Sequence, residues 1–301
     1  MRARSISLAV CSLLVVGSSV SGCPAPAEGE GEGEGEGEGE GEGEGEGEGE
    51  DITVVEGAFC DHAERRGFVH LVESFGELRL DARLHETVPE SVGPATVDEA
   101  PCANYTPVNC ATECGVDEVC GYDGACVVPV ATVVGASVKV SSSAGVVTTE
   151  TDAVTGRIEA VLEKAAGGDY TVDVEVPGTG SFTFVAAMPT PLEPVGYVDN
   201  SDGNEPAPID FSWDAANDGA AMHFYLTANH HAPIGFSECR FDDETNEHQT
   251  SAAITTPLRL VTGFEGGIAT RAFVGAASTP TGCIEVRVGV SALLLPESLI
   301  P

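Results

Sequence analysis

The stretch "ELRLDARLH" (Glu77–His85) alternates between polar and apolar side chains at every position. Neighbouring side chains of a β-strand point to opposite faces, so this pattern predicts an antiparallel strand with one buried face. The same alternation occurs in "DYTVDVEV" (Asp169–Val176), "PIDFSWD" (Pro208–Asp214) and "CIEVRVGV" (Cys283–Val290). One stretch has a helical alternative, "RIEAVLEKAA" (Arg157–Ala166), and its neighbours favour a strand. The sequence therefore predicts an all-β fold of tandem small antiparallel β-sandwich domains.

The N-terminus predicts export. Arg2 and Arg4 precede an apolar segment, "ISLAVCSLLVV" (Ile6–Val16), whose helix would cover about 16 Å, too little to span a bilayer. A signal peptide is therefore expected over residues 1–22. The following "VSGC" (Val20–Cys23) resembles the lipobox of bacterial lipoproteins, which implies attachment of lipid, including palmitate, at Cys23. The alternative is an ordinary export signal with Cys23 in a disulfide.

The residues after the cysteine predict a spacer. Pro24 stands where Asp would signal retention at the inner membrane, so the resemblance implies an outer-membrane lipoprotein, facing the periplasm or the surface. Residues 28–50 alternate strictly between Glu and Gly and have no apolar side chain to bury, so residues 23–50 are expected to be a lipidated, disordered acidic tether. Carboxylates about 7 Å apart repel one another and extend the chain. Binding of cations or basic partners by this run is the alternative.

Charge excludes one class of partner. Residues 51–301 contain 37 acidic side chains against 11 Lys and Arg, a net charge of −26. No basic patch is available to meet phosphates, so nucleic acid is excluded as a general partner. An anionic membrane surface would repel these residues as well, which leaves the lipid as the means of attachment.

Prolines and turn-forming residues divide the remaining chain into five expected segments. These are an N-terminal β region (51–101), a cysteine-rich knob (102–128), a β-sandwich (129–190), a Pro-rich linker (191–208) and a second β-sandwich (209–301).

Three of these segments resemble known domain families. "CATECGVDEVCGYDGAC" (Cys110–Cys126) resembles short EGF-like knobs, without the full set of that family's spacings. The third segment resembles carboxypeptidase regulatory-like domains through Thr151-Asp152, Gly156-Arg157-Ile158 and the turn and strand Gly167–Val172, with Ile158 where an aromatic residue is more usual. This resemblance implies an accessory sandwich without catalytic residues. The last segment resembles Ig-like or fibronectin-like sandwiches.

The cysteines predict a disulfide framework. Of ten cysteines, Cys11 leaves with the signal and Cys23 takes lipid, so eight remain in an oxidising compartment and are expected to form four disulfides. The expected pairs are Cys60–Cys102, Cys110–Cys120, Cys114–Cys126 and Cys239–Cys283. A four-cysteine zinc site is the alternative for the knob, although it lacks paired CxxC motifs.

No local motif indicates catalysis. No serine lies in GxSxG, and no cysteine remains free as a nucleophile, so no catalytic residue is assigned. Adjacent histidines point to opposite faces of a strand, and no pair fits HExxH or HxH, so the histidines are interpreted as surface residues. They are His62, His70, His85, His223, His230, His231 and His248.

Two acidic clusters are candidate calcium sites. The candidate ligands are Asp199, Asp202 and Glu205 in "DNSDGNE" and Asp242, Asp243 and Glu244 in "FDDETNE". The D-x-D-x-D-G order of a calcium loop is absent, and so acidic a chain contains such clusters by composition alone. No cofactor is therefore expected, and calcium is the one candidate. Trp213 is in phase with Ile209 and Phe211, so it is expected in the core rather than in a sugar site.

These features predict a non-catalytic lipoprotein of the cell surface or periplasm. Its expected role is structural or ligand-binding, of the adhesion type, with an extracellular or periplasmic protein or glycan as partner and with loops as contact surfaces. The alternative is an exported hydrolase whose catalytic carboxylates lie far apart in the sequence.

Overall fold

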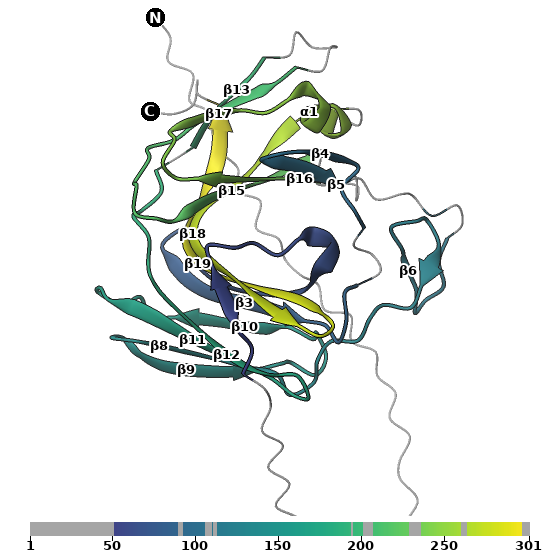
Figure 1. Cartoon of the computed structure of the whole chain (residues 1–301), viewed down its shortest axis with the longest axis vertical. Coiled ribbons are helices and arrows are strands. Elements are labelled where there is room, and N and C mark those ends of the chain that lie inside the picture. Colours follow the sequence, from purple (N-terminus) through teal and green to yellow (C-terminus); the bar gives the residue numbers. More distant parts are fainter. Residues whose placement is uncertain are drawn as a thin grey trace, which may run out of the picture. The chain divides into compact units, whose positions relative to one another are not determined.

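Two long strands, β18 (Phe264–Thr279) and β19 (Gly282–Pro296), form a hairpin at the centre of the main sheet (Figure 1). The computed structural model describes residues 51–89, 93–105, 110, 113–193, 195–200, 207–228, 236–259 and 264–296. Beside β19 lie β2 (Arg65–Ser74), β3 (Glu77–Leu84) and β10 (Ile158–Leu162). Beside β18 lie β15 (Ala221–Ala228), β16 (Phe236–Asp242), β5 (Cys102–Tyr105) and β4 (Val97–Glu99). β2 runs parallel to β19, and the other neighbours on this path are antiparallel.

Shorter strands extend this sheet, and two further sheets lie beside it. β1 (Val54–Glu56) pairs with β18, and β13 (Val195–Asp199) pairs with β19 and with β14 (Ile209–Ser212), which pairs with β17 (Glu247–Gln249). A four-stranded sheet has the order β12 (Gly180–Ala187), β11 (Asp169–Val176), β8 (Ser137–Ser142), β9 (Gly145–Glu150). β6 (Val119–Cys120) and β7 (Cys126–Val127) form a two-stranded sheet. The described residues are thus almost entirely β, which confirms the predicted fold class.

The first core fills the space between the four-stranded sheet and β10, β3, β2 and β19. The apolar side of the "ELRLDARLH" alternation faces this core, and its residues Leu78, Leu80, Ala82 and Leu84 are at most 2% exposed. Val172 and Val174 of β11 meet them from the opposite sheet. Burying one such aliphatic side chain contributes about 1.5–3 kcal/mol, so the alternation itself fixes which face of each strand packs inward.

The second core lies on the same side of the main sheet, at its other end, under β13, β14 and the one described α-helix, α1 (Ala252–Arg259). Trp213, 6% exposed, packs against Phe224 and Phe241 with ring centroids 5.3 and 5.7 Å away, as its phase in the sequence predicted. The helix was not expected. Ser251 accepts a hydrogen bond from the Ile254 amide at its start, and Ile254 is fully buried in this core.

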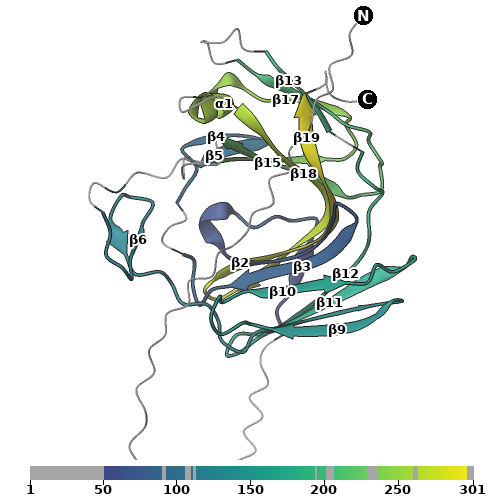
Figure 2. The ribbon, with the colours of Figure 1, turned by 180° about the vertical axis from the view of Figure 1, so that it is seen from behind.

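Figures 1 and 2 show that β18 and β19 bend along their length, so that one hairpin contributes to both cores. A glycine lets the two strands of this hairpin lie close together. A Cβ on Gly289 would lie 2.4 Å from the carbonyl oxygen of Arg271 and 2.6 Å from Cβ of Ala272, so only glycine allows the two strands to approach this closely.

Strand pairing crosses every domain boundary that the sequence analysis expected within residues 51–301. β2 and β3 of the N-terminal region pair with β19 and β10, and β5 of the knob segment pairs with β16. The expected linker 191–208 contains β13, which joins the main sheet. Residues 129–190 complete their core only with β2, β3 and β19, so they are not a separate sandwich. The described residues from Asp51 onward belong to one compact unit.

All eight expected cysteines form disulfides, but two of the four expected pairings are wrong. Cys110–Cys120 and Cys114–Cys126 are present as predicted, whereas Cys60 pairs with Cys283 and Cys102 with Cys239. The reason is sheet order: β15 and β18 separate Cys239 on β16 from Cys283 on β19. Three strand spacings amount to about 14 Å, and a disulfide needs Cα atoms within about 7 Å. Cys239 instead lies directly opposite Cys102.

The predicted signal peptide, Cys23 and the Glu-Gly run lie outside the described residues. No helix in the described part of the chain is long and apolar enough to cross a membrane.

Candidate functional site

The polar face of the main sheet lines a cavity of about 650 Å³. The strands that bury their apolar face in the first core turn their other face toward this space. The alternation of "CIEVRVGV" illustrates the point: Ile284, Val286 and Val288 are buried in the core, while Glu285 and Arg287 between them are 0% and 4% exposed. The sequence pattern predicted a polar face but not that this face would be buried too.

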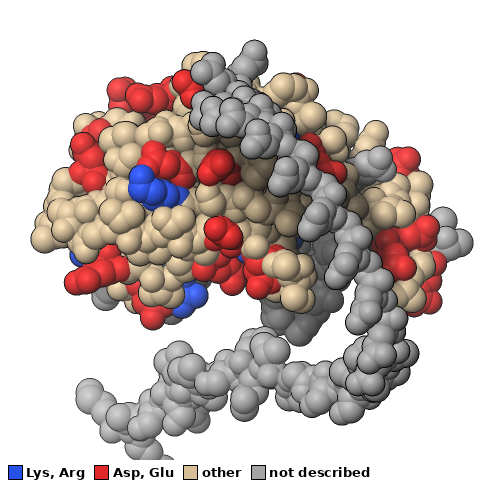
Figure 3. All heavy atoms as spheres, turned by 90° about the horizontal axis from the view of Figure 1, so that it is seen from below, with Lys and Arg blue, Asp and Glu red and all other residues tan. Residues whose placement is uncertain are grey.

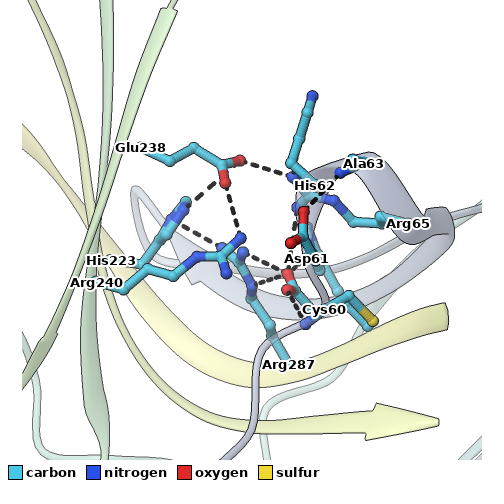
Figure 4. Close-up of polar contacts among 11 residues, drawn as sticks. Cys60, Asp61, His62, Ala63, Arg65, His223, Glu238, Arg240 and Arg287 are labelled. Carbon is cyan, nitrogen blue, oxygen red and sulfur yellow. Dashed lines mark hydrogen bonds and ion pairs between the residues drawn. The ribbon is translucent and has the colours of Figure 1, made fainter. Parts of the chain in front are cut away.

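A short 3₁₀ helix, η1 (His62–Glu64), lies against this polar face (Figure 4). Asp61 precedes it and accepts a hydrogen bond from the amide of Ala63 at 2.9 Å, which starts the turn. The turn holds His62 and leads into Arg65 at the beginning of β2. The disulfide between Cys60 and Cys283 connects the segment before η1 to β19.

Glu238 on β16 forms the first buried ion-pair group (Figure 4). Arg65 donates to its Oε1 at 2.8 Å, and Arg240 donates to its Oε2 at 2.9 Å. Glu238 is 5% exposed, so these pairs are shielded from water. Burial alone would raise the pKa of Glu238, but the positive charges of Arg65 and Arg240 outweigh it and lower that pKa to about 2.

Glu285 on β19 forms the second group. Nε of Arg287 donates to its Oε1 at 2.7 Å, Arg65 donates to the same oxygen at 3.4 Å, and the amide of Cys60 donates to Oε2 at 3.2 Å. Burial opposes ionisation, but Arg287 holds the pKa of Glu285 well below its usual value. Arg65 thus joins both carboxylates into one network. Phe59 covers it, with the guanidinium groups of Arg240 and Arg287 4.8 and 5.6 Å from its ring centre.

Four of the seven histidines line the cavity, and none of the four is a fully exposed surface residue. They are His62, His70, His85 and His223. Burial lowers the pKa of each, that of His62 to about 4. Neighbouring arginines also favour the neutral form of two of these histidines, because a positive charge nearby opposes protonation. Arg287 donates to Nδ1 of His223 at 2.8 Å, and Arg65 donates to Nδ1 of His62. The interpretation of the histidines as surface residues is therefore wrong for these four.

Aromatic side chains form one wall of the site. The rings of Phe236 and Tyr225, which both line the cavity, lie 4.9 Å apart. Tyr105 packs behind them, with its ring 5.1 Å from that of Phe236 and 4.1 Å from that of His62. Ile268 stands beside Tyr225 on the neighbouring strand and is 47% exposed. Valines of the knob region, Val119 and Val127, line the cavity as well.

The cavity concentrates arginine in a chain that has very little of it. Acidic side chains are scattered over the surface seen in Figure 3, whereas few basic ones are visible there. Four of the nine arginines of residues 51–301 line the cavity, and Glu238 is the one carboxylate among its described lining residues. The sequence shows only that arginine is scarce; Arg65, Arg66, Arg83 and Arg287 come from three strands, β2, β3 and β19, and meet only in the folded sheet.

The candidate calcium ligands do not form a site in the described residues. Asp243 is buried, with its oxygens bound to Nε of Arg271 at 3.0 Å, to Nε1 of Trp213 at 3.2 Å and to the amide of Ala216 at 3.0 Å, so it is an ion-pair partner and not a calcium ligand. Asp199, Asp242 and Glu244 are exposed, and Asp202 and Glu205 lie outside the described part of the chain. Among described residues the one group with metal-ligand spacing is Cys110, Cys114 and Cys126, which are all in disulfides.

Two further histidines, His230 and His231, also lie outside the described residues, and His248 packs against Phe241 with ring centroids 4.3 Å apart.

Comparisons with known proteins give no family. No family model and no curated protein matches the chain. Among solved structures, the chain is similar to the FN1–FN3 domains of chicken CNTN1, with 13% identity, 71% of this chain and 77% of that chain covered, and a TM-score of 0.19. It is also similar to a tetra-tandem repeat in the extending region of a large adhesion protein, with 10% identity, 81% of this chain and 49% of that chain covered, and a TM-score of 0.17. With TM-scores this low, neither match carries an argument about this chain.

Proposed function

We propose that the protein is an exported, lipid-anchored binding protein that holds a small molecule in the cavity and catalyses no reaction. The observation that carries this proposal is the cavity itself, in which an apolar wall and a few converging polar side chains enclose about 650 Å³. Sites for small molecules typically have volumes of about 300–1,000 Å³ and this mixture of lining groups.

The polar side chains of the cavity are held in place before any ligand arrives. Arg65 is fixed by Glu238 and Glu285, and Arg287 by Glu285 and His223. One long-range disulfide links β19, which bears Arg287, to the segment before η1, and the other links β16, which bears Glu238, to β5. A site that is already ordered loses less conformational entropy on binding than a flexible one. This rigidity supports binding as the role of the buried network.

The carboxylates of the site do not fit the hydrolase alternative. A glycosidase of the usual kind needs one carboxylic acid whose pKa is raised so that it can donate a proton near neutral pH. Glu238 and Glu285 have lowered pKa values because each is paired with arginine. Both are therefore anions that position the arginines.

The proposed location rests on the N-terminal sequence. Cys23 in "VSGC" would carry the lipid, and the Glu-Gly run over residues 28–50 would hold the folded part away from the membrane. A neutral Gly-rich chain of this length averages roughly 25 Å from end to end, and repulsion between the carboxylates extends it further.

The proposal is tested by filling the cavity. Thr270 lines it and is 8% exposed, so Thr270→Trp should occupy the space, whereas Ser278→Trp places the same side chain at an exposed position of the same strand. A library of small organic molecules is screened against wild type and both variants by saturation-transfer NMR, with circular dichroism to confirm folding. We expect binding by wild type and Ser278→Trp and its loss in Thr270→Trp.

Two results would contradict the proposal. The first is a set of bound molecules that Thr270→Trp leaves unchanged, which would place binding elsewhere. The second is reproducible turnover of an ester, peptide or glycoside that Glu238→Gln abolishes while Glu77→Gln does not, which would favour the hydrolase.

A further inference from the structure

We infer that the cavity is built for an organic anion, a carboxylate or similar acid on an aromatic or alkyl body. This inference rests on the proposed binding function and adds the chemical class of the ligand. It follows from the charges that face the cavity, from one guanidinium group that lacks a partner, and from the apolar wall.

The buried network does not neutralise itself. The three arginines Arg65, Arg240 and Arg287 face two carboxylates, those of Glu238 and Glu285. The histidines that line the cavity add no negative charge and are neutral at pH 7 because burial lowers their pKa values. The network therefore carries an excess positive charge, and three of its members, Arg65, Arg287 and Glu238, line the cavity.

Arg66 adds a second unbalanced charge. It lines the cavity, is 1% exposed, and donates to the carbonyl oxygen of Glu86 and to the hydroxyl groups of Thr281 and Thr179. All three partners are neutral. Its charge therefore has no opposing carboxylate among the described residues, and it adds to the positive potential inside the cavity.

Arg83 is the side chain that would bind the acid group of the ligand. It lies on β3 beside Phe68 of β2 and lines the cavity, and its side chain forms no hydrogen bond or ion pair with any residue that the structure describes. Its Nε is buried and unpartnered. A guanidinium group presents two parallel N–H donors that match a carboxylate, and a buried donor without a partner is costly. The carboxylate of a ligand would match the geometry of the Arg83 guanidinium group and would give its buried Nε a hydrogen-bond acceptor.

The apolar part of the cavity lining selects the body of the ligand. Tyr225, Phe236, Ile268 and Phe68 line the cavity and present aromatic and aliphatic surface. Such surface favours a ring or alkyl chain over a sugar or an inorganic ion. A compact inorganic anion would meet the arginines and leave this wall in contact with water.

The experiment compares three probes with the same naphthalene body: 2-naphthoate, its neutral methyl ester, and the cationic 2-naphthylmethylamine. Each is titrated by calorimetry into wild type, Arg83→Gln, Arg83→Lys and Arg79→Gln. Arg79 is the matched control, since it lies on the same face of β3 as Arg83 but is 61% exposed, pairs with Glu77 and does not line the cavity. Thermal melts confirm that every variant folds.

We expect 2-naphthoate to bind wild type at least about tenfold more tightly than either other probe. Arg83→Gln should weaken this binding by about ten- to a hundredfold, because a hydrogen-bonded charge pair is worth about 1.5–3 kcal/mol. Arg83→Lys should recover part of the affinity, and Arg79→Gln should leave it unchanged.

The possible failures are separable. If the ester binds as tightly as the acid and Arg83→Gln has no effect on either, the anion inference is wrong while the cavity remains a binding site. If 2-naphthoate binds but Arg83→Gln and Arg79→Gln both bind it as tightly as wild type, the placement of the carboxylate at Arg83 is wrong. If no probe of any charge binds, and the library screen is also negative, the binding function itself is contradicted.

Discussion

Replacing Glu238 by Gln tests whether the buried network is the main electrostatic support of the fold. In the folded protein the pKa of Glu238 is about 2, against an ordinary value of 4.5. Each pKa unit corresponds to about 1.4 kcal/mol, so the charges around Glu238 stabilise the folded state by about 3 kcal/mol at neutral pH. Breaking a buried ion pair by removing one partner typically costs a similar amount, about 3–5 kcal/mol.

The direction of the pH dependence follows from the same pKa. Because the folded-state pKa is lowered, the stabilisation is fully present above pH 4.5 and is lost as the pH falls from 4.5 toward 2, where the unfolded chain takes up the proton first. Glu238→Gln should therefore lower the free energy of unfolding by about 3 kcal/mol at pH 7, roughly 6–12 °C in Tm, and should remove this part of the acid sensitivity.

Urea unfolding between pH 2 and pH 7 measures both effects. Trp213, the single tryptophan, is buried in the second core and reports unfolding by its fluorescence. Glu77→Gln is the control, because the pair between Glu77 and Arg79 is more than half exposed and should contribute less than about 1 kcal/mol. A loss below about 1 kcal/mol in Glu238→Gln, or an unchanged pH profile in this variant, would refute the reasoning.

Three further predictions concern other parts of the chain. Mass spectrometry of unreduced peptides should find Cys60 linked to Cys283 and Cys102 linked to Cys239; a peptide that links Cys239 to Cys283 would contradict the strand order. The pKa of His62 is lowered to about 4, so the NMR signals of its ring should titrate near pH 4. The free energy of unfolding should fall as the pH drops from 6.5 to 4, because the unfolded chain binds the proton first. Titration near pH 6.5 would contradict the burial of this side chain. Cys23→Ser should release an exported, soluble protein, because the acyl chains contribute about 0.8 kcal/mol per buried CH₂; continued partitioning with membranes would disprove the anchor.

The parts of the fold that depend on local alternation could be predicted from the sequence. The buried faces of Leu78–Leu84 and of Ile284–Val290, the core position of Trp213, and the two short-range disulfides of the knob all follow from spacing within a few residues. The pairings over long sequence distances could not, because nothing in β2 specifies that it lies parallel to β19, more than 200 residues away. The two wrong disulfides and the wrong domain boundaries share this cause.

The candidate site was missed for a related reason. A strand with one apolar and one polar face is expected to expose its polar face to water, and Glu285 with Arg287 fits that expectation in the sequence. The bend of β18 and β19 and the η1 turn enclose this face instead. The buried side chains stay ionised because they form ion pairs and hydrogen bonds with one another. Opposite charges on neighbouring buried strands become visible only when the sheet order is known.

Crystals grown with 6-bromo-2-naphthoate offer the most direct test that the polar face forms a site for an organic anion. Anomalous scattering locates the bromine without assumptions about the side chains. We expect one strong bromine peak inside the cavity, between the apolar wall at Tyr225 and Ile268 and the guanidinium group of Arg83, with the carboxylate within hydrogen-bond distance of Arg83. An empty cavity at a probe concentration that saturates the protein in solution, with the bromine bound elsewhere, would contradict it.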